Sequence, residues 1–319
     1  MIKYLSTFII LTVLGILYEK YKNKYMNDDE LNKYDLINKF LLNGSEDSNK
    51  PILWVYNPNN RNSRNWGSFY SRSNDEINQP YISLCLETIV KHCGGSFKIC
   101  LIDNDSFIKL MPKWNIILNR LANPIKEHVR SLAMANLLYK YGGMCLPIST
   151  IVLKDLYPLY NQGIKTNDCF VGETINRNRT SSNLGYFVNK NIMGSLKGSR
   201  VIENFIHKLE ILNSKDYTNE MDFCGHMNMI LYNGVQGGVM SVITGKHLGI
   251  TSECNKQVLL DDLLADTFIN FDCNVSCIVI DNNELLSRTK YGWFNRLSRE
   301  QVLKARTMIS KQLLVALSR

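Results

Sequence analysis

The first patterned stretch of the chain is an uncharged run from Tyr4 to Tyr18, which reads YLSTFIILTVLGILY. It is slightly shorter than the roughly 17–25 apolar residues that span a bilayer, but the flanking lysines and tyrosines can extend it into the interface. The alternatives are a buried helix and a signal peptide, although YEKYKNKY after the run lacks the small residues of a cleavage site. The pattern predicts a single-pass membrane anchor over residues 1–25, with the membrane itself as partner through residues 4–18.

A polar stretch over residues 26–50 follows, and it is typical of a stalk. Beyond it, short apolar runs alternate with segments of helical periodicity. The runs indicate strands at 51–57, 97–102, 144–153 (interrupted by a proline), 169–172, 184–188 and 276–280. The periodic segments indicate helices at 77–92, 124–141, 199–212, 220–232 and 298–317. This alternation predicts one α/β domain over residues 51–319, with a mostly parallel sheet flanked by helices.

Composition and charge narrow the possible functions without selecting one. The 319 residues are 45% hydrophobic and 21% charged, which excludes a disordered tail and a small disulfide scaffold. The net charge of +8 admits phosphate ligands, nucleic acid and anionic membranes as partners. However, the sequence contains no helix-turn-helix, P-loop or interleaved aromatic and basic residues, so we expect no nucleic-acid partner.

Polar residues follow the first two predicted strands. Tyr56 and Asn57 end the first strand, and Asp103 and Asp105 follow the second. Because ligands of open α/β sheets bind beyond the carboxyl ends of the strands, these four residues are candidates for ligand binding. The alternative for the aspartates is a turn that they stabilise through their own side chains. The alternative for Tyr56 is a place in the core, since either it or Trp54 must face inward.

The stretch from His128 to Leu156 (HVRSLAMANLLYKYGGMCLPISTIVLKDL) resembles a known family. It is similar to glycosyltransferases of the capsular polysaccharide synthesis and mannosyltransferase-like type. In these enzymes a helix ending in LLYKYGG precedes a strand that carries an Asp-x-Asp motif. PILWVYN and CLIDNDSF resemble two upstream segments of the same enzymes in the same order. The resemblance implies a GT-A (Rossmann-like) fold, a nucleotide-sugar donor and a glycan acceptor.

The same resemblance implies that the metal-binding carboxylates are missing. The family's metal-coordinating aspartates correspond to Pro147 and Ser149, and a helix aspartate that contacts the donor corresponds to Ser131. Mn²⁺ and Mg²⁺ prefer carboxylate oxygens, whereas a proline side chain offers no oxygen and a serine hydroxyl is a weak ligand. We therefore expect no divalent metal. A degenerate branch that resembles giant-virus proteins keeps a similar GG-x-x-x-P-x-S strand.

Other polar residues are further candidates. His128 and Arg130, at the start of the helix, could bind a diphosphate without metal, or could be a packing residue and a solvated one. Ser131, Ser149 and Thr150 are candidates for contact with the donor, and the last two are otherwise ordinary strand residues.

A second pair lies late in the chain. Asp222 and His226 are four residues apart on a predicted helix and form a candidate late site or a surface pair. The sequence does not identify a catalytic residue.

Two functions remain in competition. The first is a catalytically impaired glycosyltransferase-like protein with a binding or structural role, anchored in a virion or host endomembrane. The alternative is an active, metal-independent transferase that moves a sugar from a nucleotide-sugar donor to a glycan or protein. The candidate ligands are a nucleotide-sugar and a glycan, and no cofactor is assigned.

Overall fold

The computed structural model describes residues 50–57, 79–111, 113–175, 186–215, 217 and 220–318. The strands are β1 (Ile52–Tyr56), β2 (Lys98–Ile102), β3 (Gly143–Pro147), β4 (Thr150–Val152), β5 (Cys169–Thr174), β6 (Phe187–Ser195), β7 (Ser241–Ile243) and β8 (Cys277–Val279). The longer helices are α2 (Pro80–Cys93), α4 (Ile125–Tyr141), α5 (Tyr157–Thr166), α7 (Arg200–Asn213), α8 (Glu220–Gln236) and α13 (Met308–Ser318). The short helices are α3 (Ser106–Leu110), α9 (Leu260–Leu264), α10 (Asn282–Ser287), α11 (Gly292–Asn295) and α12 (Arg299–Lys304).

The central sheet has the strand order β2-β1-β3-β6-β5-β7. β1 is parallel to β2 and β3, and β5 is parallel to β7, whereas β6 is antiparallel to both of its neighbours. Only β6 in this six-stranded sheet therefore runs against the common direction. The predicted α/β class, with a mostly parallel sheet flanked by helices, is confirmed.

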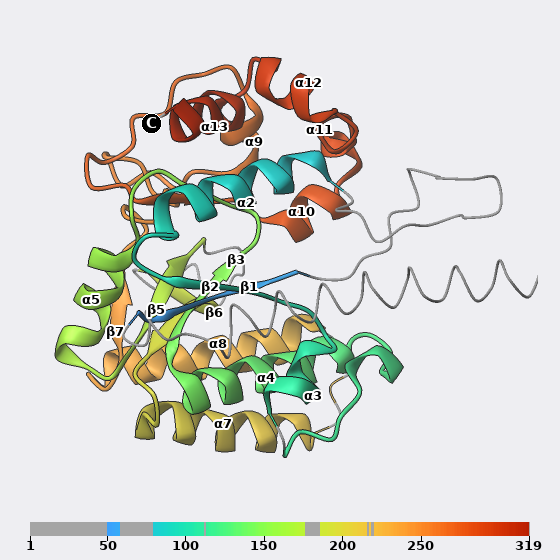
Figure 1. Ribbon diagram of the computed structural model, residues 1–319, viewed down its shortest axis with the longest axis vertical. Coiled ribbons are helices and arrows are strands. Elements are labelled where there is room, and N and C mark those ends of the chain that lie inside the picture. Colours follow the sequence, from blue (N-terminus) through green and yellow to red (C-terminus); the bar gives the residue numbers. More distant parts are fainter. Residues whose placement is uncertain are drawn as a thin grey trace, which may run out of the picture. The chain divides into compact units, whose positions relative to one another are not determined.

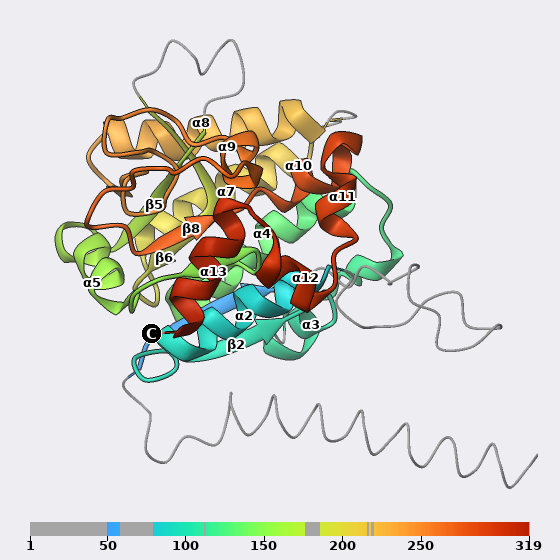
Figure 2. The same ribbon diagram turned by 90° about the horizontal axis from the view of Figure 1, so that it is seen from above.

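Helices cover both faces of the central sheet (Figures 1 and 2). In Figure 1, α2 and α9 to α13 lie above the sheet, and α4, α7 and α8 lie below it. Alternation along β1 serves both layers, because successive side chains of a strand point to opposite faces. Leu53 and Val55 enter the core that contains residues of α2 and α13. Trp54 packs against Tyr141 of α4 and donates its indole N–H to the Gly142 carbonyl at 2.9 Å.

The strand predicted over 144–153 is in fact two strands in different sheets. β3 ends at Pro147, and β4 pairs antiparallel with β8 in a separate two-stranded sheet. Pro147 lacks the N–H that would continue the ladder, so the chain leaves the central sheet there. The late strand predicted at 276–280 consequently belongs to this second sheet. β6 also differs from its prediction, since it continues to Ser195.

The long helix predicted over 298–317 is wrong, because the chain forms α12 and α13 instead. Thr307 lies between them, and its hydroxyl oxygen accepts the backbone N–H of Ser310 at 3.1 Å. A side-chain acceptor of this kind starts a new helix. A local polar cap therefore interrupts an otherwise continuous apolar periodicity.

The predicted anchor at 1–25 and nearly all of the predicted stalk lie outside the described residues. Within the described ranges, no helix is both long and apolar enough to cross a bilayer. The anchor and the proposed domain boundaries therefore remain predictions.

The cysteines provide a test of the fold. Cys85, Cys93, Cys100, Cys145, Cys169 and Cys277 are buried, and Cys254 and Cys273 are exposed. Burial raises the pKa of the Cys145 and Cys169 thiols to about 12, which makes them poor nucleophiles. We expect a thiol reagent to label the two exposed cysteines rapidly in the native chain, Cys224 slowly, and all nine in denaturant. Rapid labelling of the buried set would contradict this core.

Candidate functional site

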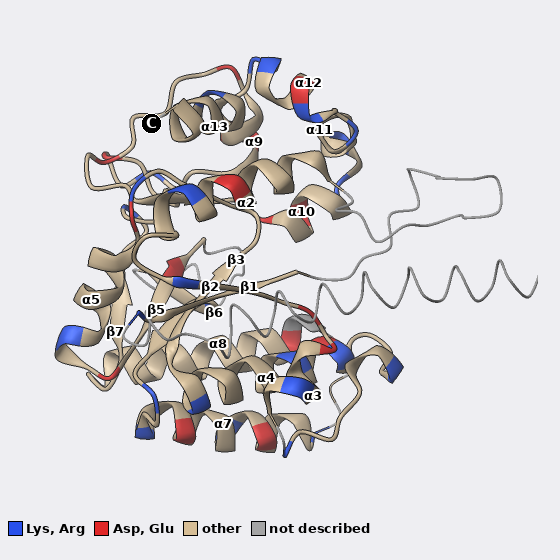
Figure 3. Cartoon of the chain, viewed as in Figure 1, with Lys and Arg blue, Asp and Glu red and all other residues tan. Residues whose placement is uncertain are grey.

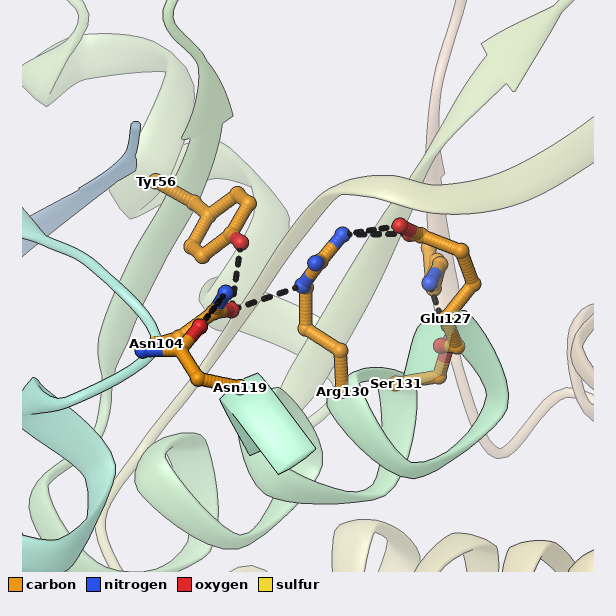
Figure 4. Close-up of polar contacts among 7 residues, drawn as sticks. Tyr56, Asn104, Asn119, Glu127, Arg130 and Ser131 are labelled. Carbon is orange, nitrogen blue, oxygen red and sulfur yellow. Dashed lines mark hydrogen bonds and ion pairs between the residues drawn. The ribbon is translucent and has the colours of Figure 1, made fainter. Parts of the chain in front are cut away.

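The candidate site is a polar network at the carboxyl ends of β1 and β2, beside the first turns of α4 (Figure 4). Tyr56, the last residue of β1, donates its hydroxyl hydrogen to Oδ1 of Asn104 at 2.7 Å. The same Oδ1 accepts a hydrogen bond from Nε of Arg130 at 3.2 Å. Nδ2 of Asn104 donates to Oδ1 of Asn119 at 2.9 Å. These hydrogen bonds make Asn104 the link between the Tyr56 hydroxyl and the Arg130 guanidinium. Asn104 is only 6% exposed, so the centre of the network is buried.

Three neighbours orient the Arg130 guanidinium. Besides the bond to Asn104, its Nη1 forms an ion pair with the carboxylate of Glu127, three residues earlier on α4. Its central carbon lies 4.6 Å from the centroid of the Tyr56 ring, a cation–π arrangement. Nη2 donates no hydrogen bond to any described residue, and 11% of the side chain is exposed. One edge of a fixed cation therefore remains for a ligand.

Protonation keeps Tyr56 a donor within this network. Burial raises the pKa of its hydroxyl well above the usual range, and the adjacent Arg130 offsets only part of this rise. The hydroxyl is therefore protonated at neutral pH and holds its hydrogen bond to Asn104.

The two predicted aspartates serve the loop itself. Oδ1 of Asp103 accepts the backbone N–H groups of Asp105 at 3.1 Å and Ser106 at 2.9 Å, which shapes the turn into α3. Oδ1 of Asp105 accepts a hydrogen bond from Asn119 at 2.8 Å. Burial and the nearby Asp103 raise the pKa of Asp105, while the Asn119 bond opposes this rise. That either carboxylate contacts a nucleotide-sugar remains a prediction.

The first turns of α4 place their two other candidates in different surroundings. The His128 ring stacks on Phe223 of α8 with centroids 3.7 Å apart, and only 4% of the residue is exposed. Ser131 donates its hydroxyl hydrogen to the Glu127 carbonyl at 2.8 Å, and its oxygen accepts a hydrogen bond from Nζ of Lys190. Sequence reasoning missed Lys190, which comes from β6.

The two positions that correspond to the metal motif, Pro147 and Ser149, lie in different surroundings. Pro147 lies beside Tyr56 in the β1·β3 ladder, at the carboxyl edge of the sheet. Ser149 is buried and donates its hydroxyl hydrogen to the Ile280 carbonyl at 2.7 Å, and its neighbour Thr150 is buried in β4. These residues do not fit a divalent cation, because one has no side-chain oxygen and the other's hydroxyl is already bonded elsewhere. No cluster of three His, Cys, Asp or Glu side chains suited to a metal occurs in the described part of the chain.

The remaining candidates are Asn57, Asp222 and His226. The backbone N–H of Asn57 donates to the Ile102 carbonyl at 2.8 Å, which extends the β1·β2 pairing past the end of β1. Asp222 and His226 are exposed on α8, and Nδ1 of His226 contacts the backbone oxygen of Asp222 at 2.9 Å. Their roles in ligand binding remain predictions.

Charged residues are interspersed over both helical layers (Figure 3). Ion pairs join C-terminal cations to acids: Lys290 to Asp261, Lys311 to Asp266 and Arg299 to Glu87. Such exposed pairs contribute little stability, although each places an acid beside its cation. The expectation of no nucleic-acid partner remains a prediction.

No protein-family model matches the chain, and no curated protein matches its sequence. Solved structures similar to it include the PaToxG glycosyltransferase, at 12% identity over 60% of this chain and 72% of that one, with a TM-score of 0.37. The galactosyltransferase LgtC, in complex with donor and acceptor sugar analogues, is 13% identical over 84% and 95% of the two chains, with a TM-score of 0.39. Mouse xyloside xylosyltransferase 1 is 11% identical over 73% and 98%, with a TM-score of 0.42. Identities and TM-scores this low do not identify a function for this chain.

Proposed function

We propose that this chain is a GT-A glycosyltransferase-like protein of the capsular polysaccharide synthesis or mannosyltransferase-like type. It binds a nucleotide-sugar without a divalent metal and is impaired in sugar transfer. The observation that carries the proposal is the network of Arg130, Asn104 and Tyr56 at the carboxyl edge of the sheet.

Strand order supports this location for the ligand. β2 and β3 lie on opposite sides of β1, so the order of strands reverses at β1. Open α/β sheets bind their ligands at such a switch point, beyond the carboxyl ends of the strands. Tyr56 and Pro147 end the two strands at this point, and α4, whose last residues LLYKY precede the two glycines, leads into β3.

The chemistry of the network suits a diphosphate. A guanidinium binds phosphate oxygens through charge-assisted hydrogen bonds, and it keeps its charge at any relevant pH. Arg130 is already oriented by Asn104, Glu127 and Tyr56, so binding costs little side-chain entropy. The nucleoside diphosphate part of a nucleotide-sugar is the class of ligand that this arrangement favours.

The same edge lacks what metal-dependent transfer needs. In that chemistry a divalent cation neutralises the charge that develops on the leaving diphosphate. Pro147 provides no oxygen for such a cation, so we infer that binding persists while transfer is slow or lost. The protein then has a binding or structural role, as a single-pass protein of a virion or host endomembrane. An active, metal-independent transferase is the second candidate, favoured by the position of Lys190 beside Ser131.

Calorimetric titration of the full chain with UDP and GDP, with Mn²⁺ or with EDTA, tests the proposal. We expect at least one nucleotide to bind equally under both conditions. Arg130→Ala should weaken it about 10- to 100-fold, because a hydrogen bond to a charged group contributes roughly 1.5–3 kcal/mol.

Arg299→Ala is the matched control, since this arginine pairs with Glu87 on the surface. It should leave the affinity unchanged. Absence of binding to both nucleotides would overturn the proposal, and binding that requires Mn²⁺ would overturn its metal independence. Release of free nucleotide from a panel of nucleotide-sugars then separates the impaired protein from the active transferase.

A further inference from the structure

β6 contains a β-bulge at residues 190–192. The register of β5 and β6 pairs Val171 with Met193, yet the next residue of β5, Gly172, pairs with Asn189. The register of β5 and β6 therefore skips residues 190–192 of β6. Bulges bend a strand and redirect its side chains, and they are frequent beside active sites.

The bulge changes the face of the sheet toward which Lys190 points. In a regular strand Lys190 and Ile192 would share one face. Ile192 enters the core that contains residues of α2 and α13, above the sheet in Figure 1. Lys190 instead donates a hydrogen bond from Nζ to Ser131 on α4, which lies below the sheet. The bulge thus delivers a cation to the layer that holds Arg130.

Register also places Lys190 at the switch point of the sheet. β3 and β6 are antiparallel, with Cys145 opposite Met193. Continuing this register by two residues sets Pro147 opposite Asn191. Lys190 therefore comes level with the point at which the chain leaves β3, beside the end of β1 that carries Tyr56.

The contact between Lys190 and Ser131 suits an anionic ligand. The Ser131 hydroxyl oxygen that accepts the hydrogen bond from Nζ is neutral, so this contact does not cancel the positive charge of the ammonium. A positive charge at this position favours an anionic ligand.

We propose that Lys190 is a second phosphate-binding residue, which acts with Arg130 on the diphosphate of the ligand. This inference rests on the proposed function, because it places the diphosphate at the same edge. Lys190 adds a second cationic side chain to Arg130, whose own charge is shared with Glu127, so both can donate charge-assisted hydrogen bonds to the diphosphate. His128, buried against Phe223, does not take this part.

The test compares Lys190→Met, which keeps the length of the side chain without its charge, with the unmodified full chain. Titrations in EDTA use UDP, UMP and pyrophosphate. We expect Lys190→Met to weaken UDP and pyrophosphate at least about tenfold and UMP less, because the second phosphate loses its partner. A merely structural effect would weaken all three alike. Lys190→Arg should restore most of the affinity.

Lys197→Met, a change of the same kind at an exposed position just after β6, should leave all three affinities unchanged. Circular dichroism and thermal unfolding check the fold of each variant, and Lys190→Gln replaces Lys190→Met if the latter does not fold. Suppose that Lys190→Met, or Lys190→Gln in its place, binds UDP as tightly as the unmodified chain while Arg130→Ala binds it more weakly. That result would overturn this inference and leave the proposed function standing. If the unmodified chain binds none of UDP, GDP and pyrophosphate, this inference and the proposed function are both overturned.

Discussion

Gly143→Ala is expected to lower the free energy of unfolding by about 3 kcal/mol or more. Gly143 begins β3 with φ +97°, a conformation that a residue with a side chain adopts at a cost of roughly 1–2 kcal/mol. A Cβ there would also lie 2.2 Å from the carbonyl oxygen of Ile52. That oxygen belongs to the backbone of β1, which is paired on both sides, so it cannot move without disturbing the ladder. Overpacking of this kind costs a further 1–3 kcal/mol or so.

Urea unfolding of the full chain, followed by tryptophan fluorescence, measures the effect. Gly198→Ala is the matched control, because Gly198 also has a positive φ of +73° but nothing lies within 4 Å of a Cβ there. It should cost only about 1–2 kcal/mol from backbone strain. Equal destabilisation by the two substitutions would show that the contact with β1 relaxes freely, contrary to this packing.

Asn104→Ala is expected to destabilise the protein by about 2–4 kcal/mol and to weaken nucleotide binding at least about tenfold. The substitution leaves the Tyr56 hydroxyl and Nε of Arg130 without their shared acceptor in a largely buried region. The guanidinium also loses one of the contacts that orient it toward the ligand. Denaturant unfolding gives the first effect, and titration with UDP or GDP gives the second.

Asn104→Asp separates these two effects. The aspartate keeps an oxygen for Tyr56 and Arg130, but it loses the donor to Asn119 and adds a negative charge beside the guanidinium. It should therefore keep more of the stability than Asn104→Ala does, while still weakening the binding of the anionic nucleotide. Asn213→Ala is the control for loss of a single hydrogen bond from a side-chain amide, the 2.8 Å bond to the Leu209 carbonyl. It should lower the free energy of unfolding by about 1 kcal/mol. Full affinity in Asn104→Ala alongside reduced affinity in Arg130→Ala would exclude a positioning role for Asn104.

The elements with strong local signals could be predicted from the sequence. The apolar run at β1, and the helical period ending in two glycines at α4, both act through neighbouring residues alone. The division of the predicted 144–153 strand could not be read in this way. A proline shows where pairing stops, but the partner of the next segment, β8, lies far along the chain.

The candidate site was partly predictable for the same reason. Arg130 and Tyr56 are adjacent to recognisable motifs, and both belong to the network. Asn104 was overlooked because it lies between two aspartates, whose carboxylates attract the functional interpretation while one of them shapes the turn. Lys190 was overlooked because a bulge is a property of paired strands and has no signature within β6 alone.

The pairing of β4 with β8 has a consequence for biosynthesis. Thr150 is opposite Val279. β4 ends at Val152 and β8 begins at Cys277, so 124 residues separate the two strands. At roughly 5–20 residues per second, a ribosome needs about 6–25 s to synthesise the intervening chain. During that interval β1, with Leu53 and Val55, has emerged, but the α13 residues that share its core have not. The nascent protein therefore presents an apolar surface that a chaperone can bind until translation is nearly complete.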